Sequence, residues 1–442
     1  MSYLRRTVEK KLLQWAQQES RKPLVLRGAR QVGKTVVARH LATAANLSLC
    51  ELNFERTPRL RTLFEKAGDL SPRILIPQIE AIVETDIRPG KTLLFLDEIQ
   101  ECPQAITFLR YLYEDLPALH TIAAGSLLEF ALQRVSTPVG RLSFAFIRPM
   151  SLEEFLIATG RSTLCKQRPK LDVTGENQHI PEAIHDALIE ALREYFIVGG
   201  MPACVAEFGK NRNFAKVREI QNDIVQTYLS DIRKYARGDL QVTNVGEVMA
   251  NAFSFVGKQI SYTVLGHGDA IKRTKQSVHL LSQAQIVHIV RSSTATKPPL
   301  AADADDKTFK LVFLDIGLGQ CLSGIKPGDL ISATDLTAIY EGRLSEQFVG
   351  QELLAASEDA SEGGHLYYWK RNARGSSAEV DYLLSRNGKI VPIEVKSGVS
   401  GRLRSLHLFL ATYGGQGICL QDTNRCANDG NVRFLPLYAT MP

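Results

Sequence analysis

An eight-residue stretch near the start of the chain has the residue types and spacing of a loop that holds phosphates. The pattern is Gly-x4-Gly-Lys-Thr, from Gly28 to Thr35. The glycines let successive backbone N–H groups point at the phosphates, and the following helix adds the positive end of its dipole. We expect the lysine to reach the β- and γ-phosphates and the threonine hydroxyl to bind Mg2+. The predicted nucleotide-binding residues are Gly28, Ala29, Arg30, Gln31, Val32, Gly33, Lys34, Thr35 and Val36.

A pair of carboxylates follows the next apolar run of the chain. Residues 91–96 predict a buried parallel strand, and Asp97 and Glu98 stand at its carboxyl end. We expect Asp97 to hold Mg2+, directly or through water, and Glu98 to act as general base on the attacking water. Such a pair is common by itself, but in this order after a phosphate loop it indicates an ATP-hydrolysing enzyme with ATP and Mg2+ as cofactors.

A serine and an arginine complete the predicted ATP site. A strand beginning at His120 is expected to end near Ser126, whose hydroxyl would sense the γ-phosphate or orient the water. A plain turn at Gly125 and Ser126 is the alternative. Arg141 is preferred to Arg148 as the arginine predicted to contact the γ-phosphate. It would act either within its own chain or on a neighbouring subunit, so both a monomer and a homo-oligomer are compatible with the sequence.

The segments around these residues predict the elements that position them. Residues 23–27 predict a strand before the loop and residues 36–45 a helix after it. An amphipathic helix is expected over 5–19, and a second strand over 50–54. This order predicts an α/β fold with a P-loop NTPase parallel-sheet core.

Composition limits what the whole chain can be. Its 442 residues, 44% of them hydrophobic, are enough for about three domains. No apolar run approaches the roughly 18 residues of a membrane span and the start has no signal core, so we expect a cytoplasmic protein without a membrane partner. Seven scattered cysteines without a Cys-x-x-Cys pair argue against a disulfide framework and a structural zinc. The net charge of +6 is compatible with nucleic acid without requiring it.

Four motifs within residues 5–158 resemble the AAA-type ATPase core of many uncharacterised bacterial and archaeal proteins. In that family the core is followed by a C-terminal module of unassigned function, and the rest of this chain looks like that module. The resemblance implies an ATPase and supplies no established biological role. The motifs are GARQVGKT (28–35), FLDEIQ (95–100), AAGSLLEF (123–130) and VGRLSFAFIRPMSLEEF (139–155).

The middle of the chain predicts a winged helix. Its helices are expected over Val248–Val256, Tyr262–Leu265 and Arg273–Leu281, with a turn at Gly266–Gly268 and a wing from Gln285. The third helix would be the recognition helix, so DNA contact is predicted through residues 258–291, although winged helices also pack against proteins. Residues 292–307 predict a linker. The side chains expected to contact DNA are Lys272, Arg273, Lys275 and Gln276.

A second chemical constellation lies in the C-terminal third. An Asn-Gly hairpin at Arg386–Gly388 joins two predicted strands, which would bring Asp381 beside Glu394 and Lys396. Asp followed by Glu-x-Lys resembles the PD-(D/E)xK nuclease superfamily, and Glu346 matches its helix carboxylate. The resemblance implies that the carboxylates bind Mg2+ or Mn2+ and that the lysine positions or activates water. Nuclease folds are also reused as binding modules without catalysis.

These observations give one fold and two functional hypotheses. The fold is a P-loop NTPase core followed by a helical and winged-helix region and a C-terminal α/β PD-(D/E)xK-like domain. The first hypothesis is a Mg2+-dependent ATPase coupled to a DNA-binding, DNA-cleaving module; the alternative is an ATP-driven switch or scaffold that binds a protein partner or DNA without cutting. The expected domains are 1–158 (ATPase core), 159–240 (helical lid or linker), 241–295 (winged helix) and 296–442 (nuclease-like).

Overall fold

In the computed structural model the chain folds into two compact units, residues 1–148 and 149–442. No helix in the described residues is long and apolar enough to cross a membrane. Ser126 and the predicted turn at Gly266–Gly268 lie outside the described residues. The described residues are 3–125, 140–235, 239–265, 271–295, 297–326, 328, 342–357, 365–371, 378–396 and 403–440.

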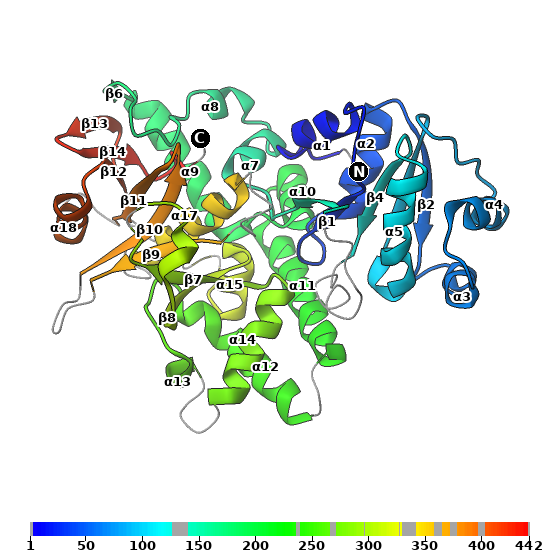
Figure 1. The fold of residues 1–442 in the computed structure, drawn as a ribbon. Coiled ribbons are helices and arrows are strands. Elements are labelled where there is room, and N and C mark those ends of the chain that lie inside the picture. Colours follow the sequence, from blue (N-terminus) through cyan, green and yellow to red (C-terminus); the bar gives the residue numbers. More distant parts are fainter. Residues whose placement is uncertain are drawn as a thin grey trace. The chain divides into compact units, whose positions relative to one another are not determined.

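The first unit is built on a five-stranded parallel sheet in the order β2-β3-β4-β1-β5 (Figure 1). All six residues of β3 are buried, and the four between Thr92 and Asp97 form an unbroken apolar run, as expected of a strand inside a parallel sheet. Because the strands are parallel, the residues that follow β1, β2 and β3 meet at one edge. The strands are β1 (Leu24–Arg27), β2 (Ser48–Asn53), β3 (Thr92–Asp97), β4 (His120–Ala124) and β5 (Ser143–Phe146).

Helices cover the parallel sheet. One hydrophobic cluster joins apolar side chains of β2 and β3 to α3, α4 and α5, and includes Phe54, Phe64 and Phe108. The helix after the phosphate loop, α2, packs on β2, β3 and β4. The helices are α1 (Glu9–Ala16), α2 (Lys34–Ala44), α3 (Pro58–Lys66), α4 (Pro72–Val83), η1 (Ile99–Glu101) and α5 (Pro103–Asp115).

The second unit holds a nine-stranded mixed sheet in the order β6-β13-β14-β12-β11-β10-β9-β7-β8. The predicted Asn-Gly hairpin is confirmed, since Arg386 pairs with Lys389 and both loop residues have positive φ. The strands are β6 (Gln178–His179), β7 (Val287–Ser293), β8 (Ala304–Phe313), β9 (Tyr367–Lys370), β10 (Glu379–Arg386), β11 (Lys389–Val395), β12 (Gly417–Gln421), β13 (Arg425–Asp429) and β14 (Val432–Pro436).

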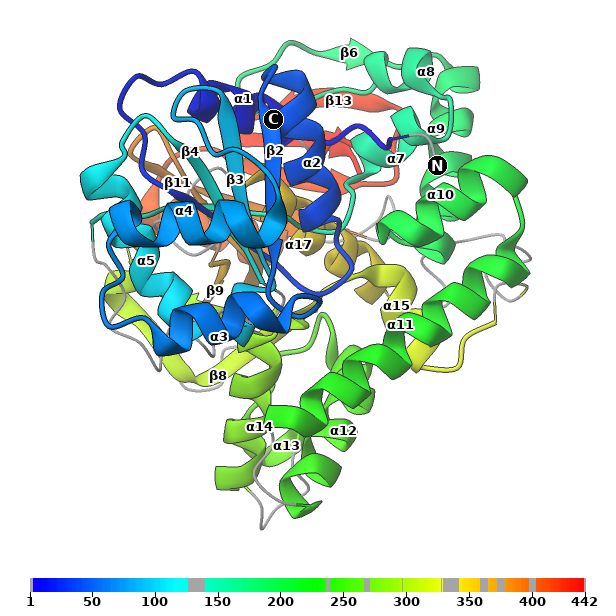
Figure 2. The same cartoon turned by 90° about the vertical axis from the view of Figure 1, so that its right-hand side faces the viewer.

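Two sets of helices in the second unit carry or contact the residues predicted to be functional. The long helix α11 leads to α12, α13 and α14 (Figure 2), while α17 and α18 pack on the sheet. The helices are α7 (Leu152–Ala158), α8 (Ser162–Lys166), α9 (Glu182–Val198), α10 (Pro202–Asn211), α11 (Phe214–Tyr235), α12 (Asp239–Ala252), η2 (Phe253–Phe255), α13 (Tyr262–Leu265), α14 (Ile271–Gln283), η3 (Leu300–Asp303), α15 (Ile316–Leu322), α17 (Arg343–Ala356) and α18 (Arg404–Tyr413).

Hydrogen bonds of one buried glutamate tie α7 to the second unit. Glu352 of α17 accepts from the backbone N–H of Leu152 (2.9 Å) and the hydroxyl of Thr440 (3.0 Å). Burial raises the pKa of Glu352 to about 7. Residues 149–158 therefore belong to the second compact unit, whereas the sequence places them at the end of the ATPase core.

The linker predicted over residues 292–307 is wrong. The chain there finishes β7, forms η3 and begins β8, and β7 and β8 pair as an antiparallel hairpin within the large sheet. Proline and small polar residues resemble a linker locally, but this segment is a hairpin connection. The three helices α12–α14 followed by this hairpin have the element order expected of a winged helix, which stays a prediction.

Candidate functional site

The phosphate loop connects β1 to α2. Gly28 has φ 144°, and a Cβ at this position would overlap the carbonyl oxygen of Ile147, so no larger residue fits. Gly33 has φ 98° and caps α2 in a left-handed conformation. The loop is also held from outside, because the buried guanidinium of Arg6 donates to the carbonyls of Val32 (2.9 Å) and Arg148 (2.6 Å). The two glycines behave as the motif requires, whereas the support from Arg6 has no local sequence signal.

The ammonium of Lys34 lies inside the loop that it is expected to serve. It donates to the carbonyls of Gly28 (2.9 Å) and Ala29 (2.7 Å). Burial lowers the pKa of Lys34 to about 8, against the opposing effect of Glu98 and Asp97. Lys34 is therefore a buried cation whose described partners are neutral backbone oxygens.

Hydroxyl, amide and carboxylate groups meet beside the loop. The Thr35 hydroxyl lies 3.2 and 3.3 Å from the two oxygens of Asp97, and the Asn53 amide donates to Asp97 at 3.2 Å. Burial raises the pKa of Asp97. These oxygens are the ligand types that Mg2+ prefers, so the residues fit a magnesium ion shared with a bound phosphate. Asn53 is absent from the predicted set, although a polar residue at the carboxyl end of a predicted parallel strand was a usable signal.

Glu98 stands next to this group in a left-handed backbone conformation, with φ 51°. The side-chain amide of Gln100 donates to its carboxylate at 2.6 Å. Gln100 thus orients the predicted general base, a role that no local sequence pattern indicates.

Arg141 lies at the wrong edge of the sheet to reach a nucleotide bound by its own loop. It precedes the amino end of β5, and its Nε lies 2.5 Å from the carboxylate of Glu114, near the end of α5. The length of the strands separates this edge from the phosphate loop by roughly 10 Å or more. The arginine after the carboxyl end of β5 is Arg148, which is buried and stacks on Phe146 at 4.7 Å.

The predicted C-terminal residues come together around an unpredicted cation. Glu346 on α17 and Asp381 on β10 both bind the ammonium of Lys310 on β8, at 2.8 and 3.1 Å, and Glu379 is a third ion-pair partner. The carboxylates outweigh burial and raise the pKa of Lys310 well above its ordinary value. We call Lys310, Glu346, Glu379 and Asp381 the Lys310 cluster.

Glu394 and Lys396 pair with each other beside this cluster. Their ion pair is 2.6 Å long, and burial, then Asp381, raises the pKa of Glu394 to about 8. Alternation along a strand predicts that Ile393 and Val395 face the core. Ile393 is buried, but Val395 is only half-buried while Glu394 is 5% exposed. Strand β11 contacts both α17 and α18, so burial along it does not follow a simple alternation between a core face and a solvent face.

The fit of a metal ion here is poor. Both oxygens of Asp381 are engaged, one by Lys310 and the other by the backbone N–H of Val395 at 2.8 Å. Among the described residues, the second oxygen of Glu394 is buried and has no hydrogen-bond partner. Within the described residues, no group of three or more His, Cys, Asp or Glu side chains is arranged to hold a metal ion.

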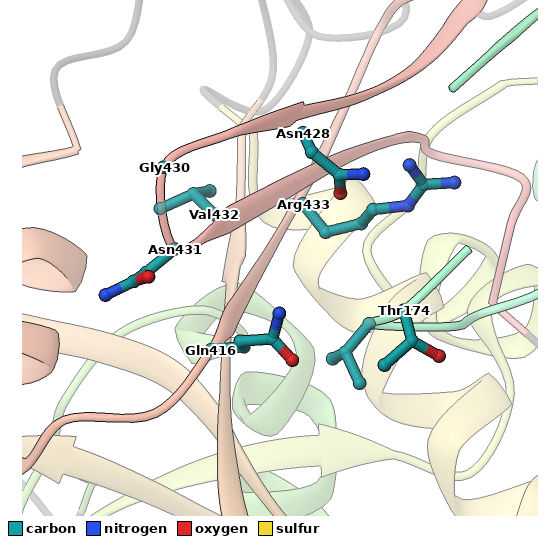
Figure 3. A pocket seen from close by; sticks show the side chains of 8 residues that line it. Thr174, Gln416, Asn428, Gly430, Asn431, Val432 and Arg433 are labelled. Carbon is teal, nitrogen blue, oxygen red and sulfur yellow. The ribbon is translucent and has the colours of Figure 1, made fainter. Parts of the chain in front are cut away.

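A polar pocket of about 330 Å³ lies elsewhere in the second unit and contains none of the predicted site residues (Figure 3). Arg433 of β14 lines it and donates to the carbonyl of Glu176 at 2.7 Å. Thr174, Gln416 and Asn431 contribute further polar groups. We assign this pocket no role.

Comparisons with known proteins identify the type of domain for the first unit but not for the second. Residues 20–156 match a family model described as an AAA domain, while residues 189–329 and 341–440 match two domains of unknown function, DUF8612 and DUF4143. No functionally curated protein matches the chain.

Solved structures resemble the chain at low identity. The Walker-type ATPase PABY2304 of Pyrococcus abyssi is 16% identical, with a TM-score of 0.43 over 72% of this chain and 96% of that one. PCH-2 of C. elegans is 13% identical, with a TM-score of 0.27 over 47% of this chain and 62% of that one. The AAA-domain match, together with the parallel sheet and its loop, identifies the first unit as a P-loop, AAA-type ATPase-like fold.

Proposed function

We propose that residues 1–148 bind ATP with Mg2+ and hydrolyse it. The observation that carries the proposal is the convergence of Lys34, Thr35, Asp97 and Glu98 at one edge of the parallel sheet. The loop N–H groups and Lys34 would hold the phosphates, and Thr35 and Asp97 would hold the metal. Bound Mg2+ neutralises charge on the phosphate oxygens.

The remaining residues would prepare the attacking water. Glu98, oriented by Gln100, is placed to accept its proton. Arg148 is our candidate for a contact with the γ-phosphate from within the chain. Arg141 would serve only a neighbouring subunit, because it lies at the opposite sheet edge.

Two variants test ATP hydrolysis directly. Glu98→Gln keeps the shape of the side chain but removes the base, so we expect normal ATP affinity with turnover reduced about 100-fold or more. Lys34→Ala should lose binding as well. ATP binding by calorimetry and phosphate release separate the two effects. Full turnover of Glu98→Gln would show that Glu98 is not the general base. Unchanged ATP binding by Lys34→Ala would show that the loop is not the ATP-binding site.

A mixing experiment tests the role of Arg141. Inactive Lys34→Ala and Arg141→Ala proteins, combined at equal concentration, should recover part of the wild-type turnover if one subunit's arginine serves the next subunit's loop. Arg110→Ala is the matched control, since Arg110 pairs with the same carboxylate of Glu114 at 3.0 Å. Normal turnover of Arg141→Ala alone would leave Arg141 as a surface residue.

We further propose that the second unit binds DNA and that nucleotide state controls this binding. Support comes from α14, where Lys272, Arg273, Lys275 and Gln276 are all exposed. Exposed cations on one helix face suit phosphate contacts. A second candidate, a protein partner, is favoured by two exposed apolar side chains close by in sequence, Val264 (49%) and Ile271 (48%).

Charge reversal separates these candidates. Lys272→Glu with Arg273→Glu should weaken binding of labelled DNA and flatten its salt dependence, measured by fluorescence anisotropy with and without ATP. Lys389→Glu, at an exposed lysine in the β10–β11 turn, is the control. Equal DNA binding by all three proteins would favour the protein partner.

A further inference from the structure

The Lys310 cluster has a buried ammonium at its centre. Only 2% of the Lys310 side chain is exposed, and it contacts oxygens of Glu346 at 2.8 Å and Asp381 at 3.1 Å as well as the carboxylate of Glu379. The three carboxylates come from α17 and β10, and the lysine comes from β8. Three elements are therefore joined through one cation.

This ammonium uses the oxygens that a divalent cation would need. Hard cations bind through carboxylate oxygens, several at a time. Here Glu346 and Asp381 each give Lys310 an oxygen, and Asp381 gives its other oxygen to the N–H of Val395. A metal ion could bind only after Lys310 had left a site where it has three anionic partners.

The neighbouring pair does not restore a metal site. Lys396 already occupies one oxygen of Glu394 at 2.6 Å. The other oxygen is buried and has no hydrogen-bond partner in the part of the chain that the structure describes, so it is a single ligand atom. Two ammonium groups thus offset part of the negative charge of these four carboxylates from within the protein.

We infer that Lys310 is the resident cation of the C-terminal carboxylate cluster, in place of a divalent metal, so that the module holds its partner without metal-dependent phosphodiester cleavage. The inference deepens the proposed binding role of the second unit and is independent of ATP hydrolysis. It also makes a positive prediction, because removal of the ammonium should leave three carboxylates facing one vacated position.

Mn2+ binding tests the inference directly. The full chain carrying Asp97→Asn, which silences the phosphate loop, is titrated with Mn2+ without nucleotide, and free Mn2+ is followed by electron paramagnetic resonance. We expect no tight site in this parent. Adding Lys310→Met should create one Mn2+ site that binds at least tenfold more tightly than any site of the parent. Adding Glu346→Gln to that protein should abolish the new site.

Lys370→Met is the matched control. Lys370 lies on β9 of the same sheet and interacts with Asp305 and Thr308, and we expect no gain of Mn2+ binding from its removal. One tight Mn2+ site in the parent, lost on Asp381→Asn, would overturn the inference. The inference would also be overturned if the Lys310→Met protein folds and binds no more Mn2+ than the parent.

Folding of the Lys310 variant is checked by circular dichroism. If Lys310→Met does not fold, two measurements test the inference: the Mn2+ titration of the parent, and DNA cleavage by the wild-type chain in Mg2+ or Mn2+. Absence of both tight binding and cleavage supports the inference, and either one contradicts it. ATP turnover of the wild-type chain is measured separately, so a failure here leaves the ATPase proposal standing.

Discussion

Lys34 and Lys310 are both buried lysines close to carboxylates, yet their environments are opposite. Lys34 donates to backbone carbonyls of its own loop, and burial lowers its pKa to about 8. Lys310 contacts three carboxylates, which raise its pKa well above the ordinary value despite burial. The lysine that must meet an anionic ligand hydrogen-bonds to neutral carbonyls among the described residues, whereas the other lysine is already in direct contact with carboxylates of its own protein. This difference separates a site prepared for a ligand from a cluster that already holds a cation of its own.

The largest expected effect is on stability. Lys310→Ala should destabilise the second unit by about 3–5 kcal/mol, because it leaves buried carboxylates without their counter-charge. Lys34→Ala should cost about 1 kcal/mol or less in its own unit, since only carbonyl partners are lost. The chain has two tryptophans, Trp15 and Trp369, one in each unit. Urea unfolding followed by fluorescence in Trp15→Phe and Trp369→Phe backgrounds therefore reports each unit alone, and equal losses would break the comparison.

The second expected effect is on ATP affinity. Gly28→Ala should weaken ATP binding about 100-fold, or about 2.7 kcal/mol, because the new Cβ overlaps the Ile147 carbonyl and the loop must move. Gly90→Ala is the control, since Gly90 also has positive φ (78°) but no atom within 4 Å of an added Cβ. Calorimetry of both variants is the measurement. An equal loss of ATP affinity in both variants would mean that the positive φ, and not the overlap with the Ile147 carbonyl, causes the loss.

A smaller effect is expected at Gln100. Gln100→Ala frees the carboxylate of Glu98 from its 2.6 Å hydrogen bond, and we expect turnover to fall about tenfold with ATP affinity unchanged. Gln78→Ala, on the exposed face of α4, is the control. A fall in affinity instead of turnover would place Gln100 in loop structure.

The smallest effect is a proton taken up on binding. At pH 8.5 the free protein holds Lys34 partly deprotonated, because its pKa is about 8. ATP phosphates favour the charged form, so binding should take up a fraction of a proton, and affinity should fall as the pH rises above 8. Calorimetry in two buffers of different ionisation enthalpy measures the uptake. No uptake at pH 8.5 would mean that the Lys34 pKa is not lowered.

Local rules predict the phosphate loop and the Asn-Gly hairpin from the sequence. Residue type fixes the loop geometry at Gly28 and Gly33, and the apolar run before Asp97 fixes the strand that positions it. The position of Arg141 at the sheet edge opposite the phosphate loop could not be predicted, for a specific reason. Strand β5, from Ser143 to Phe146, is not predicted, so the edge on which Arg141 lies could not be assigned.

Long-range contacts explain what the sequence could not predict. Lys310 is 36 residues from Glu346 and 71 from Asp381 along the chain, and no spacing rule joins them. Its segment also follows residues that resemble a linker, which hides the strand β8. Four acidic and basic residues in the order of a nuclease motif therefore predict proximity, but not the cation at their centre.

The position of Lys310 on β8 bears on how this module can be inherited or engineered. The family model for the last domain spans residues 341–440 and includes all three acidic partners, but β8 ends at Phe313 and matches the preceding model. A segment cut at residue 341 would carry its acids without their base. A segment that keeps the cluster intact must therefore begin no later than the β7–β8 hairpin. A gene fusion made at the family boundary would separate Lys310 from its three carboxylate partners.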